Sequence, residues 1–122
     1  MKKQYKDEQG LIYERLMDKT LSVIKCTSEE EKIIIPNDYK GMKITTIGSH
    51  AFERCISLKS IEIGDSVCFI QECAFKWCNA LQEVTMGQSV SCIDNKAFYG
   101  CDSLIRIVLS LPFVGTLALL LL

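Results

Sequence analysis

The chain has a single histidine, and it has no glycine-rich phosphate loop, no paired-histidine motif and no dinucleotide fingerprint. A nucleophile–histidine–acid triad needs a group that orients the histidine, and no neighbour can be argued to do this for His50. His50 also shares a repeat position with Cys73 and Lys96, which predicts a solvent-facing side chain. We therefore expect a protein without enzymatic activity and without a cofactor.

An excess of charge is also lacking, because 14 basic and 15 acidic side chains leave a formal net charge of −1. This balance gives no reason to expect a nucleic acid or an anionic membrane as the partner. A secretory signal is missing too, since no apolar segment follows the charged residues 1–10. The sequence as written therefore predicts a cytoplasmic start.

The seven cysteines are an odd number in a chain without such a signal, so they cannot all pair, and reduced thiols are expected. Cys55, Cys78 and Cys101 recur at a constant spacing, which favours core packing as small apolar side chains. Cys68, Cys73 and Cys78 follow one another every five residues, unlike the Cys-x-x-Cys spacing of zinc sites. No metal site is predicted.

What the chain does contain is a 23-residue repeat, present in three tandem copies that begin at Ile47, Ile70 and Ile93. Seven positions carry matching residue types in each copy: Ile44/Val67/Val90, Ala51/Ala74/Ala97, Phe52/Phe75/Phe98, Cys55/Cys78/Cys101, Leu58/Leu81/Leu104, Ile61/Val84/Ile107 and Ile63/Met86/Leu109. A period of 20 to 29 residues with a Leu-x-x-Leu-x-Leu core is typical of stacked coils, because one coil alone cannot bury its apolar side.

Each coil is expected to contain two extended segments and a turn. In the first copy, Ile61 and Ile63 alternate with polar residues, which predicts a half-buried strand in a parallel sheet. The Val-x-x-Ile element predicts a second, shorter strand, and the Ala-Phe-x-x-Cys segment a helical turn. Gly41, Gly64 and Gly87 follow the main strand, where we expect corners that need a positive φ.

The predicted fold class is α/β and β-rich, a short right-handed leucine-rich-repeat solenoid with parallel strands, short helical turns and an N-terminal β cap. Residues 1–46 are assigned to the cap and entry segment, residues 47–109 to three repeats, and residues 110–122 to an apolar C-terminal tail. Two partly alternating segments within residues 11–26 predict the strands of the cap.

The apolar tail belongs to a stretch, residues 107–122, that carries no charge over 16 residues. A membrane-spanning helix needs about 20 apolar residues, and Pro112 and Gly115 interrupt this stretch. A tail that folds over the last coil, or a truncated longer array, is therefore favoured over membrane contact through residues 110–122.

The run Ile47-Gly-Ser-His-Ala-Phe-Glu-Arg-Cys-Ile-Ser-Leu-Lys-Ser-Ile-Glu-Ile63 resembles the BspA-like leucine-rich repeats, which are typical of surface proteins of bacteria and some protists. The entry segment Lys32-Ile-Ile-Ile-Pro36 is similar as well, so the resemblance covers roughly residues 11–109. It implies adhesion or protein recognition by the outside of the solenoid, no shared catalytic residues, and a cell-surface location as the alternative to the cytoplasm.

The candidate protein-binding face consists of outward positions on and beside the predicted strands, together with one tryptophan that is expected to be exposed. Its members are Lys59, Ser60, Glu62, Gln82, Glu83, Thr85, Arg106 and Trp77. Three strands about 4.8 Å apart, each about 17 Å long, offer roughly 240 Å², whereas a standard interface needs about 800 Å² per partner. A protein ligand is expected, with a structural or truncated fragment of a longer surface array as the alternative.

Overall fold

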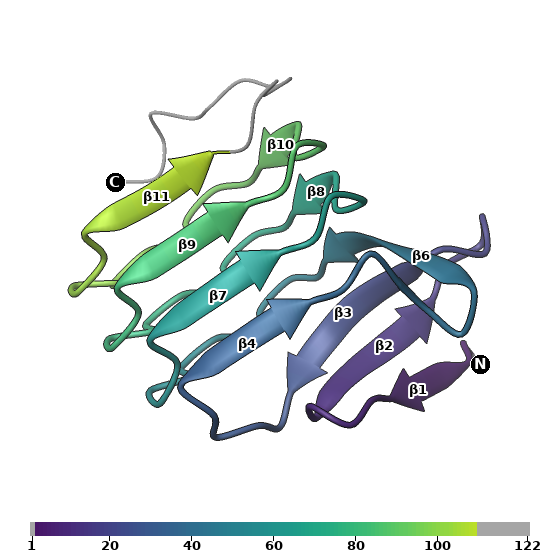
Figure 1. Ribbon diagram of the computed structural model, residues 1–122, viewed down its shortest axis with the longest axis horizontal. Coiled ribbons are helices and arrows are strands. Elements are labelled where there is room, and N and C mark those ends of the chain that lie inside the picture. Colours follow the sequence, from purple (N-terminus) through teal and green to yellow (C-terminus); the bar gives the residue numbers. More distant parts are fainter. Residues whose placement is uncertain (1, 110–122) are drawn as a thin grey trace.

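The computed structural model describes residues 2–109, and within them it contains eleven strands and no helix (Figure 1). The strands are β1 Gln4–Lys6, β2 Leu11–Arg15, β3 Leu21–Cys26, β4 Lys32–Ile35, β5 Asp38–Tyr39, β6 Met42–Ile47, β7 Ser60–Ile63, β8 Phe69–Ile70, β9 Glu83–Met86, β10 Cys92–Ile93 and β11 Arg106–Leu109. They form two sheets that face each other across a buried core, as the predicted solenoid requires.

The four-stranded sheet is entirely parallel, in the order β11-β9-β7-β4. Its register keeps the 23-residue offset, with Ser60 beside Glu83 and Glu83 beside Arg106. Strand β4 continues this register because Lys32 pairs with Ser60. The stack therefore has about four coils, and it begins inside the segment that the sequence assigned to the cap and entry.

The seven-stranded sheet combines parallel strands of the coils with antiparallel strands of the cap, in the order β1-β2-β3-β6-β8-β10, with β5 paired to β6. Strands β6, β8 and β10 are parallel and supply one short strand per coil. Strand β2 is antiparallel to both of its neighbours, β1 and β3, and these three strands lie at the end of the stack opposite β11 (Figure 1). The predicted β cap is thus confirmed.

The third side of the solenoid consists of turns over residues 48–55, 71–78 and 94–101, which we call the turn side. These segments were expected to be helical turns, and within residues 2–109 no helix forms, because only every second amide donates within its own turn, to a carbonyl three residues back, while the others donate to the next coil. The Phe52 amide donates to the Ala74 carbonyl, and the Phe75 amide to the Ala97 carbonyl, both at 2.7 Å. Hydrogen bonds between coils therefore hold this side together as they do the two sheets.

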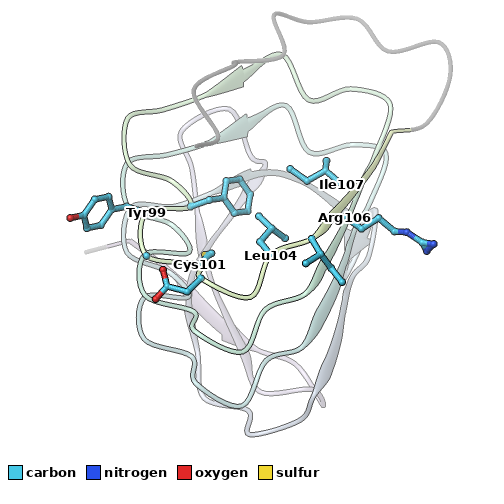
Figure 2. A pocket seen from close by; sticks show the side chains of 9 residues that line it. Tyr99, Cys101, Leu104, Arg106 and Ile107 are labelled. Carbon is cyan, nitrogen blue, oxygen red and sulfur yellow. The ribbon is translucent and has the colours of Figure 1, made fainter.

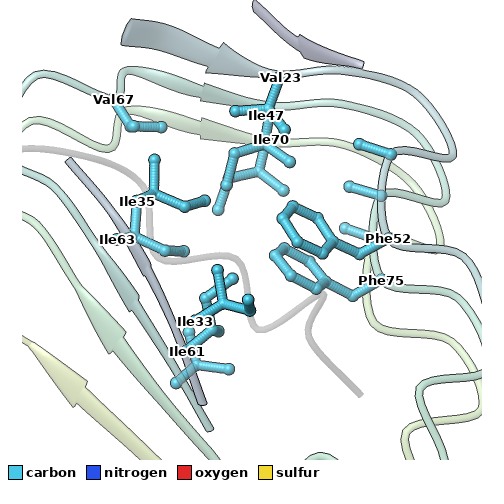
Figure 3. Packing of buried hydrophobic residues seen from close by; sticks show 14 of the residues in the cluster. Val23, Ile33, Ile35, Ile47, Phe52, Ile61, Ile63, Val67, Ile70 and Phe75 are labelled. Carbon is cyan, nitrogen blue, oxygen red and sulfur yellow. The ribbon is translucent and has the colours of Figure 1, made fainter. Parts of the chain in front are cut away.

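The core is a set of apolar columns that run through the stack (Figure 3). Phe52 stacks on Phe75 with ring centroids 4.9 Å apart, and Phe75 stacks on Phe98 at 5.0 Å, with interplanar angles of 10° and 3°. Ile61 and Ile63 point inward from β7 and are buried, as the alternation predicted. Burial of such side chains is the main force that favours the folded stack.

The corner glycines are required for a different reason than the one inferred from the sequence. Gly41 has φ of +78° and sits between β5 and β6, but Gly64 and Gly87 are not among the residues with positive φ. A Cβ on Gly64 would lie 2.6 Å from the Ile35 carbonyl oxygen, and a Cβ on Gly87 would lie 2.8 Å from that of Ile63. Close approach of neighbouring coils therefore excludes a side chain at these two corners.

The outer edge of β4 is blocked by a side chain of the cap. The Gln9 side chain donates to the Ile34 carbonyl at 2.6 Å and accepts from the Ile34 amide at 3.0 Å. The side-chain amide of Gln9 thus makes the two hydrogen bonds to Ile34 that the backbone of an added strand would otherwise make. Open strand edges favour association with other chains, and this pair of hydrogen bonds protects the edge at its centre.

Replacing Gln9 by glutamate should lower the free energy of unfolding by about 1–2 kcal/mol, because a carboxylate cannot donate to the Ile34 carbonyl that it faces. Light scattering at rising concentration should also show more association than for the unmodified protein. Gln71→Glu is the matched control, since Gln71 only accepts, from the Ser49 amide at 3.2 Å. Equal stability and equal scattering of the two variants would contradict the edge-blocking role.

The opposite end of the stack presents the last coil, with a hollow of about 630 Å³ beside β11. Figure 2 shows Leu104 and Ile107 directed into this hollow, and Tyr99 and Arg106 directed away from it. The tail over residues 110–122, predicted either to fold over this coil or to be part of a truncated longer array, lies outside the described residues. Within residues 2–109, no helix is long and apolar enough to cross a bilayer.

Candidate interaction surface

The structure brings seven of the eight predicted binding residues together on the outer face of the four-stranded sheet. They lie on β7, β9 and β11 or directly before β7 and β9: Lys59, Ser60, Glu62, Gln82, Glu83, Thr85 and Arg106. Trp77 is not part of this face, because it belongs to the turn side. The predicted site is therefore divided between two sides of the solenoid.

The charges on the four-stranded sheet are largely paired with one another. Arg106 lies 3.2 Å from Glu83, as the cross-strand register predicted, and two further pairs join Lys59 to Glu31 at 2.9 Å and Lys32 to Glu62 at 3.2 Å. Exposed pairs of this kind contribute about 0–1 kcal/mol each to stability. They also leave this face with little uncompensated charge for a partner.

A second group of side chains, all exposed except the half-buried Lys76, surrounds Trp77 on the turn side. The Arg54 guanidinium lies 4.5 Å from the Trp77 ring centroid, and the Lys76 ammonium lies 4.4 Å from it. Lys76 and Lys96 both lie 5.8 Å from the ring centroid of Tyr99. These distances are those of cation–π contacts. We call Arg54, Lys76, Trp77, Lys96 and Tyr99 the basic aromatic ridge.

The backbone that carries the ridge adopts an unusual conformation. Arg54 and Trp77 both have φ of +61°, and Lys96 has φ of +58°. A bulky residue with positive φ is an outlier, and glycine avoids its cost, as Gly100 does at the corresponding position of the next coil. Trp77 covers Gly100 so closely that a Cβ there would collide with the indole ring. The turn geometry thus fixes Trp77 between Arg54 and the last coil.

The three cations of the ridge have no carboxylate partner within ion-pair distance among residues 2–109. Tyr99 is 54% exposed, and Trp77 is half-buried. The ridge therefore combines unneutralised positive charge with flat aromatic surface, unlike the paired charges of the four-stranded sheet. Such a combination can bind an anionic group by charge and an adjacent apolar group by contact.

Sequence reasoning identified Trp77 alone and missed the rest of the ridge. The signal was present in the repeat, because Lys76 and Tyr99 are 23 residues apart, as are Arg54 and Trp77. Residues 23 apart lie side by side in adjacent coils, so basic and aromatic residues at these neighbouring positions meet on one surface. A comparison of the variable repeat positions, and not only the constant ones, would have found the ridge.

The histidine is exposed, as predicted, with Nδ1 lying 3.1 Å from the Glu53 carboxylate. Lys96 at the same repeat position is exposed too, but Cys73 is buried, so the expectation of a solvent-facing position was wrong there. A short thiol gains from burial where charged side chains stay in water. Within the described part of the chain, no three His, Cys, Asp or Glu residues are grouped so that they could hold a metal ion.

Comparison with known proteins agrees with this architecture. The family model of the BspA type leucine-rich repeat region (6 copies) matches residues 24–115. The crystal structure of a T. pallidum leucine-rich repeat protein is similar with a TM-score of 0.82 at 22% identity, over 89% of this chain and 52% of that chain. This chain therefore spans about half the length of that protein. No curated protein matches it.

Two further crystal structures are similar at slightly higher identity. A leucine-rich repeat protein of Bacteroides capillosus has a TM-score of 0.76 at 25% identity, over 93% of this chain and 92% of that chain. A leucine-rich cell surface protein of Faecalibacterium prausnitzii has a TM-score of 0.70 at 26% identity, over 88% of this chain and 31% of that chain. The match over most of the chain and the observed solenoid show that this protein belongs to the BspA-type leucine-rich repeat family.

Proposed function

We propose that the protein is a protein-recognition module, and that it binds an acidic segment of a partner protein through the basic aromatic ridge. The observation that carries this proposal is a group of three cations around Trp77 and Tyr99, with Arg54 and Lys96 exposed and Lys76 half-buried, that have no carboxylate partner among residues 2–109. Carboxylates can pair with the cations while apolar atoms of the partner contact the rings. The outer face of the four-stranded sheet, whose charges are paired, would then lie outside the interface.

A titration of the purified protein with a short oligo-glutamate peptide tests this proposal. Trp77 is the only tryptophan of the chain, so its fluorescence reports on the ridge alone. We expect a saturable change with oligo-glutamate, none with oligo-lysine, and a loss of binding as salt screens the charges. An oligonucleotide that binds more tightly than the peptide would overturn the assignment to a protein partner.

Matched charge reversals separate the two faces. The double variant Lys76→Glu/Lys96→Glu should weaken peptide binding about tenfold, which corresponds to about 1.4 kcal/mol. The control Lys32→Glu/Lys59→Glu makes the same change of net charge on the four-stranded sheet, and it should leave the affinity within about twofold. If both double variants weaken binding equally, the effect is one of net charge and the ridge is not the site.

The cell-surface or adhesive role implied by the family is a further part of this proposal, supported by the similarity to a cell surface protein of Faecalibacterium prausnitzii. A second candidate function is that of a structural segment in a longer array, favoured by the apolar hollow beside β11 in the last coil. Sedimentation experiments distinguish the two. End-to-end association of a protein that binds no acidic peptide would support the structural role.

A further inference from the structure

The cysteines at the constant repeat position continue into the cap and form a row of four thiols, Cys26, Cys55, Cys78 and Cys101, which we call the thiol row. The Cys55 thiol lies close enough to those of Cys26 and Cys78 for them to affect its pKa. Cys78 and Cys101 affect one another in the same way. All four are free thiols.

The spacing of the coils suits a covalent bond between adjacent members of the row. Phe52, Phe75 and Phe98, which stand three residues before the repeat cysteines, stack with ring centroids 4.9 and 5.0 Å apart. The backbone of Cys26 lies against the first repeat, because its amide donates to the Ala51 carbonyl at 3.1 Å. Disulfides join residues whose Cα atoms are about 4.4–6.8 Å apart. The Cys78 and Cys101 sulfurs also lean toward the preceding coil, since they donate to the Phe52 and Phe75 carbonyls at 3.0 and 3.1 Å.

The members of the row differ in how easily a reagent reaches them. Cys26, Cys55 and Cys101 are half-buried, whereas Cys78 is fully buried. The hydrogen bond from the Cys26 thiol is the main cause that lowers the pKa of Cys55, and thiolates are the reactive form. A small reagent can therefore reach a reactive sulfur at Cys55, next to a second thiol that can complete the reaction.

We propose that the thiol row is an oxidative modification site that reacts with small-molecule disulfides such as oxidised glutathione. The pairs formed are Cys26–Cys55 and Cys78–Cys101. Because the row is linear, a bond between Cys55 and Cys78 would leave the two outer thiols without a neighbour. The two proposed bonds use all four thiols. Cys26–Cys55 joins the cap to the first repeat, and Cys78–Cys101 joins the second repeat to the third.

The reaction balances without any further reactant. The Cys55 thiolate, whose proton has passed to water, attacks one sulfur of oxidised glutathione, the glutathione disulfide breaks, and one glutathione leaves as a thiolate. The Cys26 thiol then gives its proton to this thiolate and attacks the Cys55 sulfur, and the second glutathione leaves as a thiolate that takes up a proton from water. Two protein thiols are thereby oxidised to one disulfide, and the glutathione disulfide is reduced to two thiols. Cys101 and Cys78 react in the same way.

Peptide mapping of the full chain tests this proposal. The reduced protein is incubated with oxidised glutathione, the remaining thiols are alkylated, and disulfide-linked peptides are identified by mass spectrometry. We expect peptides that link Cys26 to Cys55 and Cys78 to Cys101, with Cys92 alkylated or carrying glutathione. A linked peptide that joins Cys92 to the row, or glutathione adducts without any linked pair in the row, would overturn the proposal.

Thermal unfolding gives an independent readout. Oxidation should raise the Tm by about 5–10 °C, because both bonds restrict the unfolded chain, and a reducing agent should reverse the rise. The variant Cys26→Ser should lose the Cys26–Cys55 peptide and part of the rise, whereas the control Cys92→Ser, at an exposed position, should keep both. A rise of the same size in Cys26→Ser would contradict the assigned pairing.

Discussion

Replacing Phe75 by alanine should lower the free energy of unfolding by about 3–5 kcal/mol, the largest effect we expect of any single substitution. The Phe75 ring is fully buried between Phe52 and Phe98, and it stacks on both at about 5 Å. Its removal leaves a cavity in the middle of the stack and separates the two remaining rings. Neighbouring coils cannot close the gap, because hydrogen bonds on all three sides fix their spacing.

Phe69→Ala is the matched control, because it makes the same chemical change on an exposed strand. Phe69 lies on β8 with 47% of its surface exposed. We expect its loss to cost less than about 1 kcal/mol. Thermal and urea unfolding of both variants, followed by far-ultraviolet circular dichroism, gives the comparison. Similar melting curves for Phe75→Ala and Phe69→Ala would show that the phenylalanine column does not organise the core.

Gly87→Ala should destabilise the protein by about 2–3 kcal/mol, although it adds only one methyl group. The new Cβ would lie 2.7 Å from the Gly64 carbonyl carbon and 2.8 Å from the Ile63 carbonyl oxygen. Both atoms belong to the backbone of the adjacent coil, so they cannot rotate away as a side chain would. The two coils would have to separate locally, which weakens the hydrogen bonds between β7 and β9.

Gly41→Ala distinguishes this steric effect from the general cost of replacing glycine. Gly41 has positive φ, but a Cβ there meets nothing within 4 Å. Only the strain of a left-handed residue applies, about 1 kcal/mol. In urea unfolding, the Gly41→Ala variant should therefore have a clearly higher free energy of unfolding than the Gly87→Ala variant. The reverse order would mean that conformation, and not coil contact, decides which corners need glycine.

The period of 23 residues was enough to predict the stacking, because residues one period apart must lie side by side in adjacent coils. On this basis Phe52, Ile61 and Cys78 were predicted to lie in the core, and all three are buried. The extra coil at β4 was harder to predict, since the β5–β6 hairpin lengthens the segment between β4 and β6, the two strands of this coil, and so disturbs the 23-residue spacing. The turns needed structural information as well, because every second amide in them donates to the neighbouring coil.

Two features of the candidate site, the ridge and part of the ion pairing on the four-stranded sheet, could not be predicted from the constant positions of the repeat. The ridge residues vary from one copy to the next, so attention to constant positions passes over Lys76 and Tyr99. The pairing of Glu83 with Arg106 was predictable from register, but the contacts of Lys59 and Lys32 cross between segments that the repeat does not relate. Constant positions predict the fold, and variable positions carry the proposed recognition surface.

Amide chemical-shift mapping tests the central claim most directly. The isotope-labelled protein is titrated with the oligo-glutamate peptide while the backbone amides of all strands and turns are observed. If the ridge is the recognition surface, the shifts should concentrate at Arg54, Trp77 and Gly100, and the amides of β7 and β9 should change little. Shifts centred on the four-stranded sheet, or no saturable shifts at all, would contradict it.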